Sequence, residues 1–145
     1  MEDIKKNGEV GTGPFAGRKV LIVDDDDFLL NMYSLKFRKE GLLVEVSHGG
    51  AETIAKLKGG YTPDLMLLDV VMPAMDGLEL LQNIRNEKLA EKSVVVMLTN
   101  QSQQTDIDRA KELGIQGYII KASTIPSEVL AETLSILKAA LARAS

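Results

Sequence analysis

Residues 65–77 read LMLLDVVMPAMDG, and this stretch decides the fold. It opens with four apolar residues and then places the carboxylate of Asp69. A short apolar run bounded by turn residues is typical of a strand buried on both faces of a parallel sheet. Pro73 and the Asp-Gly pair that ends the stretch predict a turn, and the pattern after Gly77 is helical. The stretch therefore predicts a buried strand, a turn and a helix, with one acid at the carboxyl end of the strand.

The same unit recurs along the chain, which predicts a doubly wound α/β fold. Short apolar runs alternate with amphipathic helical patterns, and glycines or prolines separate them. The expected strands span residues 20–23, 42–46, 65–69, 93–99 and 117–120. The expected helices span residues 28–39, 50–58, 78–86, 105–113 and 127–142. Glu45 interrupts the second strand and favours an edge position for it.

Polar or charged side chains close four of the expected strands. The five residues concerned are Asp24, Asp25, Asp69, Thr99 and Lys121. The carboxyl ends of parallel strands share one edge of a sheet, and ligands bind there at the point where the strand order reverses. In a five-stranded sheet of order 2-1-3-4-5, that point lies between the first and third strands. We therefore expect these side chains to meet at one site.

Three clustered carboxylates repel one another and need a compensating charge. At an effective dielectric constant of about 20, each pair separated by about 4 Å costs roughly 4 kcal/mol. Mg²⁺ prefers oxygen ligands and usually keeps several waters beside one or two carboxylates. Lys121 adds a fixed positive charge, and Thr99 adds a donor for an anion. The set indicates a phosphoryl-transfer site that uses Mg²⁺.

These segments resemble the receiver domain of response regulators in two-component signalling, of the chemotaxis-regulator type. The resemblance covers about residues 18–142, and the residues around Asp69 are its most specific part. The matching segments are VLIVDD (20–25), PDLMLLDVVMPAMDG (63–77), VVMLT (95–99) and GYIIK (117–121). The resemblance implies a flavodoxin-like fold and a signalling switch that catalyses only its own phosphorylation and dephosphorylation.

The resemblance also implies a role for each acidic residue. Asp69 matches the phosphoacceptor, which takes a phosphoryl group from the phosphohistidine of a sensor histidine kinase or phosphotransfer protein. Asp25 matches the direct metal ligand, and Asp24 matches its neighbour, which often acts through water. Val71 matches the residue whose backbone carbonyl completes the protein's share of the metal ligands.

Three further residues match the switching apparatus of the family. Thr99 matches the hydroxyl that moves onto the phosphoryl group, and Lys121 matches the lysine that pairs with that group. Tyr118 matches the aromatic residue whose rotamer follows this movement. In the family, phosphorylation shifts an equilibrium between two states of the face formed by the fourth helix, fifth strand and fifth helix. That face would control binding to a downstream protein that the sequence does not name.

The chain departs from the family pattern at three positions. Ala122 stands where proline usually follows the site lysine, so we expect a trans peptide bond and a different loop there. Asn100 replaces a small residue after the switch hydroxyl and narrows access to the phosphoryl group. Val71 has no polar atom to orient a hydrolytic water, which predicts a long-lived phosphoryl group.

Two other functions compete with this interpretation. The segment VLIVDDD also resembles the opening of haloacid-dehalogenase-type phosphatases, in which Asp24 would be the nucleophile. That alternative leaves Asp69 without a role. The second alternative is a pseudo-receiver, an interaction module that works without phosphorylation, and the replacements Ala122 and Asn100 leave room for it.

The bulk properties limit the remaining possibilities. The chain has 145 residues, no cysteine and a net charge of −4, without a concentrated Lys/Arg face, so we expect no direct nucleic-acid binding. It contains neither an apolar stretch of about 18 residues nor a signal-peptide core, so we expect no membrane span and a cytoplasmic location. Glycines and a proline predict a flexible tail over residues 1–17, followed by the receiver domain over residues 18–145. The chain stops near the last expected helix, which fits either a single-domain regulator or a piece of a longer protein.

The last expected helix carries more apolar residues than one buried face needs. Four leucines form a core stripe at helical spacing, namely Leu130, Leu134, Leu137 and Leu141. Val129, Ile136 and Ala140 widen this arc. The surplus favours a surface for self-association, and so a homodimer, or for a partner. The alternative is a helix end that the domain itself covers.

Overall fold

The computed structural model describes residues 13–100, 103–121 and 124–144, which form one five-stranded sheet and five helices. The strands are β1 (Lys19–Val23), β2 (Leu43–Ser47), β3 (Leu65–Asp69), β4 (Val94–Thr99) and β5 (Gly117–Ile120). The helices are α1 (Asp27–Lys39), α2 (Gly50–Lys58), α3 (Gly77–Asn86), α4 (Gln104–Glu112) and α5 (Pro126–Ala144). All strand pairs are parallel, in the order β2-β1-β3-β4-β5. The predicted fold and strand order are confirmed.

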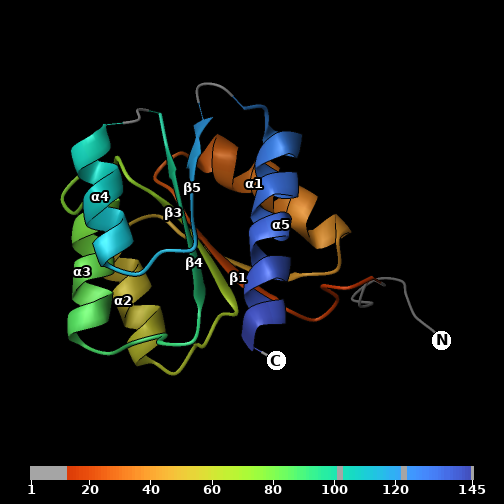
Figure 1. Ribbon diagram of the computed structural model, residues 1–145, viewed down its shortest axis with the longest axis horizontal. Helices are drawn as coiled ribbons and strands as arrows, with labels where there is room; N and C mark the ends of the chain where they lie inside the picture. The colour runs from red at the N-terminus through yellow and green to blue at the C-terminus, as the bar shows by residue number, and fades with distance from the viewer. Residues whose placement is uncertain (1–12, 101–102, 122–123, 145) are drawn as a thin grey trace.

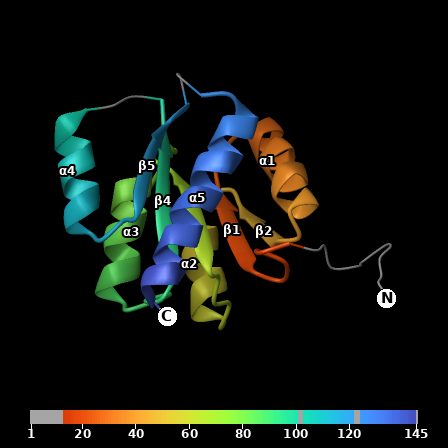
Figure 2. The ribbon, with the colours of Figure 1, turned by 45° about the vertical axis from the view of Figure 1, so that its right-hand side comes forward.

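The sheet lies between two layers of helices (Figures 1 and 2). Helices α1 and α5 cover one face, and α2, α3 and α4 cover the other. Successive side chains of β1 supply the two hydrophobic cores in turn, because a strand points alternate residues to opposite faces. Val20 and Ile22 pack toward α1 and α5, whereas Leu21 and Val23 pack toward α2 and α3. Both faces of the central strands are therefore buried, as their continuous apolar runs predicted.

Strand β2 forms one edge of the sheet, as the interruption by Glu45 predicted. It pairs with β1 alone, and its residues are less buried than those of β3 and β4. Glu45 forms an ion pair with Lys56 of α2, with 3.3 Å between Nζ and Oε1. Strand β1 lies between β2 and β3, so the chain builds the sheet in one direction from β1 to β2 and in the other direction from β3 onward. The strand order therefore reverses between β1 and β3.

The folded unit begins before the predicted boundary at residue 18. Phe15 is buried in the core beneath α1 and α5, with 8% of its surface exposed. The Gly17 amide donates a hydrogen bond to the Gly41 carbonyl at 2.9 Å. Residues 13–17 therefore pack against the domain, whereas residues 1–12 of the predicted tail lie outside the described residues. A single aromatic among glycines has no periodicity, so the sequence pattern could not reveal this contact.

The apolar surplus of α5 is packed within the domain. Val129 is 1% exposed and belongs to the core. Ile136 and Ala140 are partly buried against the same core, and Ile136 fills the space where a residue other than Gly117 would place its Cβ. Val129 thus cannot contribute to the predicted surface for self-association, whereas Ile136 and Ala140 keep part of their surface exposed. Neither α5 nor any other helix within the described ranges is long and apolar enough to cross a membrane.

Candidate functional site

The carboxyl edge of the sheet brings three acids together. Asp24 follows β1, Asp25 comes next, and Asp69 ends β3. Each offers a carboxylate oxygen, and these oxygens lie within 4.8 Å of one another. Asp24 and Asp69 are 1% and 5% exposed, whereas Asp25 is open to solvent. The predicted acidic cluster therefore exists, and its oxygen ligands with one open side fit Mg²⁺, which keeps several waters.

Lys121 joins the two buried acids. Its Nζ lies 3.2 Å from Asp24 Oδ2 and 3.2 Å from Asp69 Oδ1, and its side chain is 11% exposed. The residue follows β5, so it approaches the acids from the far side of β4. A single amine is shared between two carboxylates, which leaves the cluster with an excess of negative charge.

Burial, more than the excess charge, determines the pKa values of the two buried acids. Burial raises the pKa of Asp69 to about 6, the charge of Asp24 adds to the rise, and Lys121 opposes it. Burial also raises the pKa of Asp24, against the hydrogen bond from the Asp26 amide and the charge of Lys121. Both carboxylates are therefore less stable as anions than in water, as expected of a site suited to a bound cation.

The same contacts favour the charged form of Lys121. Burial by itself lowers its pKa, but the charges of Asp69 and Asp24 and their hydrogen bonds together outweigh burial. The net shift is upward. Lys121 therefore stays a cation at neutral pH and can stabilise an anionic group beside Asp69.

The backbone around Asp24 fixes the direction of its carboxylate. The Asp24 amide donates to the Ser47 carbonyl at 3.1 Å, which continues the β1–β2 pairing. Asp24 Oδ1 accepts a hydrogen bond from the Asp26 amide at 2.9 Å. Asp26 is the N-cap of α1, and its side chain accepts bonds from the Phe28 and Leu29 amides at 2.9 and 3.2 Å. Asp26 thus shapes the turn that aims its neighbour.

The turn after Asp69 is equally constrained. The Gly77 amide donates to the Val70 carbonyl at 2.7 Å, so the chain folds back onto the end of β3. A Cβ on Gly77 would overlap the Asp69 carbonyl oxygen, so glycine is required by this close approach. Asp76 and Glu79 form a capping box that begins α3. The Asp-Gly pair of the sequence stretch therefore holds the phosphoacceptor candidate in place.

The remaining predicted residues lie around this cluster. Thr99 ends β4 beside β3 and is 2% exposed, and Val71 is 61% exposed just after Asp69. Tyr118 is half-buried on β5. Burial and the charge of Asp106 raise the pKa of its phenol, and the nearby Thr99 hydroxyl opposes the rise. Thr99 and Tyr118 are thus neighbours, as their predicted roles require.

Two of the three residues that depart from the family pattern lie at the carboxyl edge of the sheet. Asn100 follows Thr99 and is exposed, and the side chain of Val71 is exposed as well. Ala122 lies outside the described residues, so the peptide bond predicted for it is not placed.

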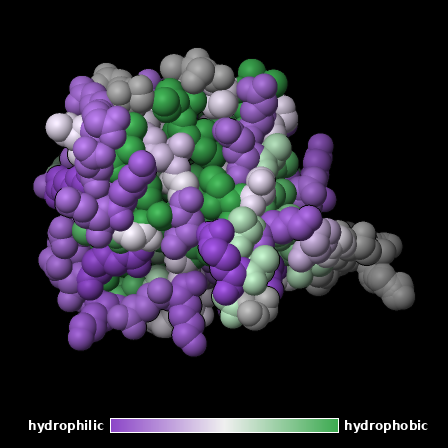
Figure 3. Space-filling view, in the orientation of Figure 1, coloured by the Kyte–Doolittle hydropathy of each residue, from purple (hydrophilic) through white to green (hydrophobic). Residues whose placement is uncertain are grey.

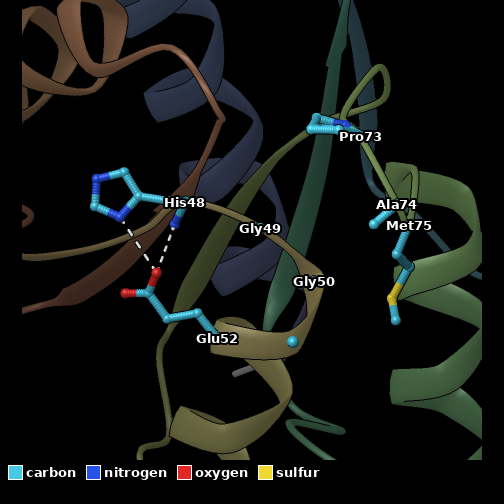
Figure 4. A pocket seen from close by; sticks show the side chains of 8 residues that line it. His48, Gly49, Gly50, Glu52, Pro73, Ala74 and Met75 are labelled. Carbon is cyan, nitrogen blue, oxygen red and sulfur yellow. Dashed lines mark hydrogen bonds and ion pairs between the residues drawn. The ribbon is translucent and has the colours of Figure 1, made fainter.

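A pocket of about 380 Å³ lies beside the site, between the loop before α2 and the loop before α3 (Figure 4). Met75 faces it from the second loop, whereas the imidazole of His48 turns toward Glu52. His48 Nε2 lies 2.9 Å from Asp27 Oδ1, and Nδ1 lies 3.2 Å from Glu52 Oε1. His48 therefore links the starts of α1 and α2 at the surface.

Sequence reasoning missed one residue beneath the site. Tyr33 of α1 is 3% exposed in the core. Burial raises the pKa of its phenol, Lys121 opposes the rise, and Asp24 and Asp69 add to it. The helical period of α1 places Tyr33 on the buried face, but it cannot show that this face reaches the acids.

Comparison with models of known protein families matches residues 20–133 to the response regulator receiver domain. The chain belongs to this family. Such receiver domains are signalling switches of two-component systems, and they interact with histidine kinases or phosphotransfer proteins and with downstream targets. The phosphatase alternative loses its basis, because the receiver family accounts for both Asp24 and Asp69.

The relatives of this receiver domain include long and short proteins. It is 33% identical over 110 residues to the regulator of RpoS of Escherichia coli, a match that covers 76% of this chain and 32% of that protein. It is 31% identical over 110 residues to the chemotaxis protein CheY of Halobacterium salinarum, covering 76% of this chain and 89% of that protein. The chain thus spans about a third of the first relative and most of the second.

Solved receiver structures share the fold of this domain. The CheY-like receiver domain protein of Methanospirillum hungatei has a TM-score of 0.78 at 25% identity, covering 88% of this chain and 99% of that one. The chemotaxis protein CheY4 of Vibrio cholerae has a TM-score of 0.75 at 28% identity, covering 83% and 99%.

Proposed function

We propose that the folded part of this chain is a phosphoacceptor receiver domain of a two-component phosphorelay. It takes a phosphoryl group from a histidine kinase or phosphotransfer protein onto Asp69 with the help of Mg²⁺. Phosphorylation then switches the face of α4, β5 and α5 and so controls the binding of a downstream protein. One observation carries the proposal: Lys121 Nζ lies 3.2 Å from carboxylates of both Asp24 and Asp69, with Asp25 beside them.

The acids and one backbone carbonyl would hold the metal ion. These ligands are the carboxylates of Asp24, Asp25 and Asp69, which cluster in the structure, and the carbonyl of Val71, which rests on the family pattern alone. The clustering of the three carboxylates and the raised pKa values of Asp24 and Asp69 support this assignment. Mg²⁺ at such a site neutralises charge on the transferring phosphoryl oxygens.

The phosphoryl transfer needs only groups that this site and its donor supply. A carboxylate oxygen of Asp69 attacks the phosphorus of a phosphohistidine. The new P–O bond forms as the P–N bond breaks, and the electron pair of that bond stays on the imidazole nitrogen. Lys121 pairs with the phosphoryl oxygens, and the Thr99 hydroxyl donates a hydrogen bond to them. Both residues lie at the same edge as Asp69, which supports these roles.

The surroundings of Asp69 favour a protein as donor. Three large apolar side chains at the carboxyl edge are exposed: Phe28 by 70%, Val71 by 61% and Ile125 by 60%. Asp69 is only 5% exposed, so a donor must press against this rim to reach it. Exposed apolar residues around a recessed acid are what a docking protein would cover.

The switch itself would run through Thr99 and Tyr118. A hydroxyl drawn toward the phosphoryl group vacates the space beside the Tyr118 ring, so a rotamer change there can follow. Tyr118 is half-buried, and its hydroxyl is buried without a hydrogen bond of normal geometry to any described residue. The Thr99 hydroxyl lies close enough to influence the pKa of the Tyr118 phenol, and this proximity supports the proposed coupling between the two side chains.

The test is phosphorylation by a small donor. The protein is incubated with Mg²⁺ and acetyl phosphate, and its intact mass is measured beside Asp69→Asn and Asp24→Asn. We expect one added phosphoryl group on the wild type and none on Asp69→Asn. Peptide mapping should place the group on Asp69. Phosphorylation at Asp24 instead would refute the assignment of the nucleophile.

If no phosphoryl group is added to the wild type, two explanations remain, and a Mg²⁺ titration distinguishes them. A protein that binds Mg²⁺ but ignores acetyl phosphate is a receiver that selects its donor, and a kinase extract should then label it. A protein that binds no Mg²⁺ is the interaction module that Asn100 and Ala122 leave open.

A further inference from the structure

Helix α4 is packed against the domain mainly at its carboxyl-terminal end. Within Gln104–Glu112 only Ala110 is buried, and it lies in the last turn. Gln104 and Thr105 of the first turn are exposed. The outer surface of the helix is hydrophilic along its length (Figure 3). The start of α4 lies at the carboxyl edge of the sheet, on the side of Thr99, and its end lies toward the opposite edge (Figure 1).

The end of α4 is closed by a tight set of backbone hydrogen bonds. The Gly114 amide donates to the Lys111 carbonyl at 3.0 Å, and the Ile115 amide donates to the Ala110 carbonyl at 3.4 Å. Gly114 has a φ of 84°, the left-handed conformation that this type of helix end requires. These bonds satisfy two of the last carbonyls of the helix. The carbonyls of Leu113 and Gly114 need partners from elsewhere.

Arg85 of α3 supplies those partners. Its Nε donates to the Leu113 carbonyl at 2.7 Å, and Nη2 donates to the Gly114 carbonyl at 3.2 Å. The side chain is partly buried, and burial lowers its pKa, although Glu91 opposes this shift. One guanidinium thus binds two successive carbonyls at a helix end, where a positive charge also favours the helix dipole.

The next residue along the chain is fixed as well. The Gln116 amide donates to the Val95 carbonyl at 2.8 Å, and the Val95 amide donates to Gln116 Oε1 at 2.7 Å. Gln116 therefore bonds twice to β4 before β5 begins. Together with Arg85, it anchors residues 113–116 to two rigid elements, α3 and β4.

We propose that Arg85 and Gln116 hold the carboxyl-terminal end of α4 in place in both states of the switch, so that α4 pivots about this end. Only the amino-terminal end, on the side of Thr99, then moves when a phosphoryl group is present. This inference rests on the proposed phosphoacceptor function. Arg85 and Gln116 act through α4 and are positioning residues: neither contacts Asp69.

Hydrogen–deuterium exchange with and without beryllofluoride and Mg²⁺ tests the pivot directly. Beryllofluoride stands in for the phosphoryl group on an aspartate. In the wild type we expect exchange to change in residues 104–108 and to stay constant in residues 113–116. In Arg85→Met, which keeps the apolar stem, exchange at 113–116 should rise about tenfold even without the ligand, because two charge-assisted hydrogen bonds are lost.

Two further variants separate anchoring from general loss of stability. Arg38→Met removes the same charge from the exposed surface of α1 and should leave exchange at 113–116 unchanged. Gln116→Met should loosen the same segment as Arg85→Met. In both anchor variants the response to beryllofluoride should spread into 113–116, which simple destabilisation would not produce.

Each outcome decides the proposal. An equal response at both ends of α4 in the wild type would overturn the pivot, and so would unchanged exchange at 113–116 in Arg85→Met. The wild-type measurement stands by itself if a variant does not fold. No response to beryllofluoride around Asp69 would refute the phosphoacceptor function and the pivot with it, whereas a response there with both ends moving refutes the pivot alone.

Discussion

The carboxylate of Asp69 is almost completely removed from water, and this burial governs its charge. Its pKa rises on folding from 3.8 to about 6. A carboxyl group with a raised pKa binds its proton more tightly in the native state than in the unfolded chain. Its contribution to stability is therefore fully present below about pH 4 and is lost as the pH rises through about 6. Without a bound cation, the ionised Asp69 thus destabilises the protein at neutral pH.

Replacing Asp69 should reveal this cost. In EDTA at about pH 7.5 we expect Asp69→Asn to be more stable than the wild type by roughly 3 kcal/mol, since a shift of about two pKa units has that order of free energy. The difference should shrink toward about pH 4, where both side chains are neutral. Urea unfolding at several pH values measures it. Asp108→Asn, at an exposed acid of α4, is the control, and a gap independent of pH would contradict the argument.

Val71 should control how long the phosphoryl group lasts. Its exposed isopropyl group cannot hydrogen-bond a water beside the aspartyl phosphate, so we expect slow hydrolysis. Val71→Gln supplies a polar atom and should shorten the lifetime several-fold, whereas Val71→Ala should not. Intact mass followed over time after removal of the donor gives both rates. A short lifetime that is the same in all three proteins would contradict this role.

The residues that sequence could predict share one property: they stand at strand ends. Asp69 and Lys121 lie far apart in the chain, but the topology of a parallel sheet brings such positions to one edge. The missed contacts have another origin. Arg85 and Gln116 bond to backbone groups of distant segments, and any residue type can present a carbonyl or an amide. Their partners follow only from the packing of α4.

At the scale of elements, helices α1 and α5 each carry a buried hydroxyl group. Ser34 is 4% exposed and Thr133 is not exposed at all. Neither hydroxyl has a hydrogen-bond partner among the described residues. A buried polar group without a partner keeps its full desolvation penalty, so each of these two positions is less stable than an apolar residue of the same shape would be.

Thr133→Val should therefore stabilise the domain. Valine keeps the shape of threonine and removes the unpaired hydroxyl, so we expect a gain of about 1 kcal/mol in urea unfolding. Thr53→Val is the matched control, because the Thr53 hydroxyl donates to Ser47 Oγ at 2.8 Å and contacts the Gly49 carbonyl at 2.9 Å. That variant should lose stability. A gain for Thr53→Val or a loss for Thr133→Val would contradict this account.

The elements themselves were predictable because apolar runs and stop signals agree along the chain. All ten were found, with ends shifted by a residue or two. Helix α1 begins at Asp27 because Asp26 caps it, as acidic residues at a helix start often do. Phe15 escaped prediction because its burial depends on α1 and α5 together rather than on its neighbours in sequence.

At the scale of the whole molecule, five large apolar side chains are exposed within the described residues: Leu35 of α1 and Leu43 of β2 lie away from the carboxyl edge, and three lie at it. Phe28, Val71 and Ile125 are exposed there, whereas Val129 is buried. Three separate side chains around a recessed acid are too few for a stable interface between two copies. The molecule therefore has a surface suited to brief contacts with a donor.

We accordingly expect the protein to be a monomer. Light scattering coupled to size exclusion should give the mass of one chain with and without beryllofluoride and Mg²⁺. Phe28→Ser should leave this mass unchanged while it slows phosphorylation by a protein donor, with acetyl phosphate as the control donor. A dimer that forms with the phosphoryl mimic would show that α4, β5 and α5 still provide an interface.

The shared lysine also bears on the order in which the chain is made. Asp24 and Asp69 leave the ribosome well before Lys121, which is 97 residues beyond Asp24. Until β5 joins the sheet, the growing chain holds its carboxylates without the amine that offsets them. The last strand thus completes the sheet and brings the positive charge of Lys121 to the acids. A chain interrupted before β5 would have the three carboxylates of a receiver but would lack the amine that offsets their repulsion.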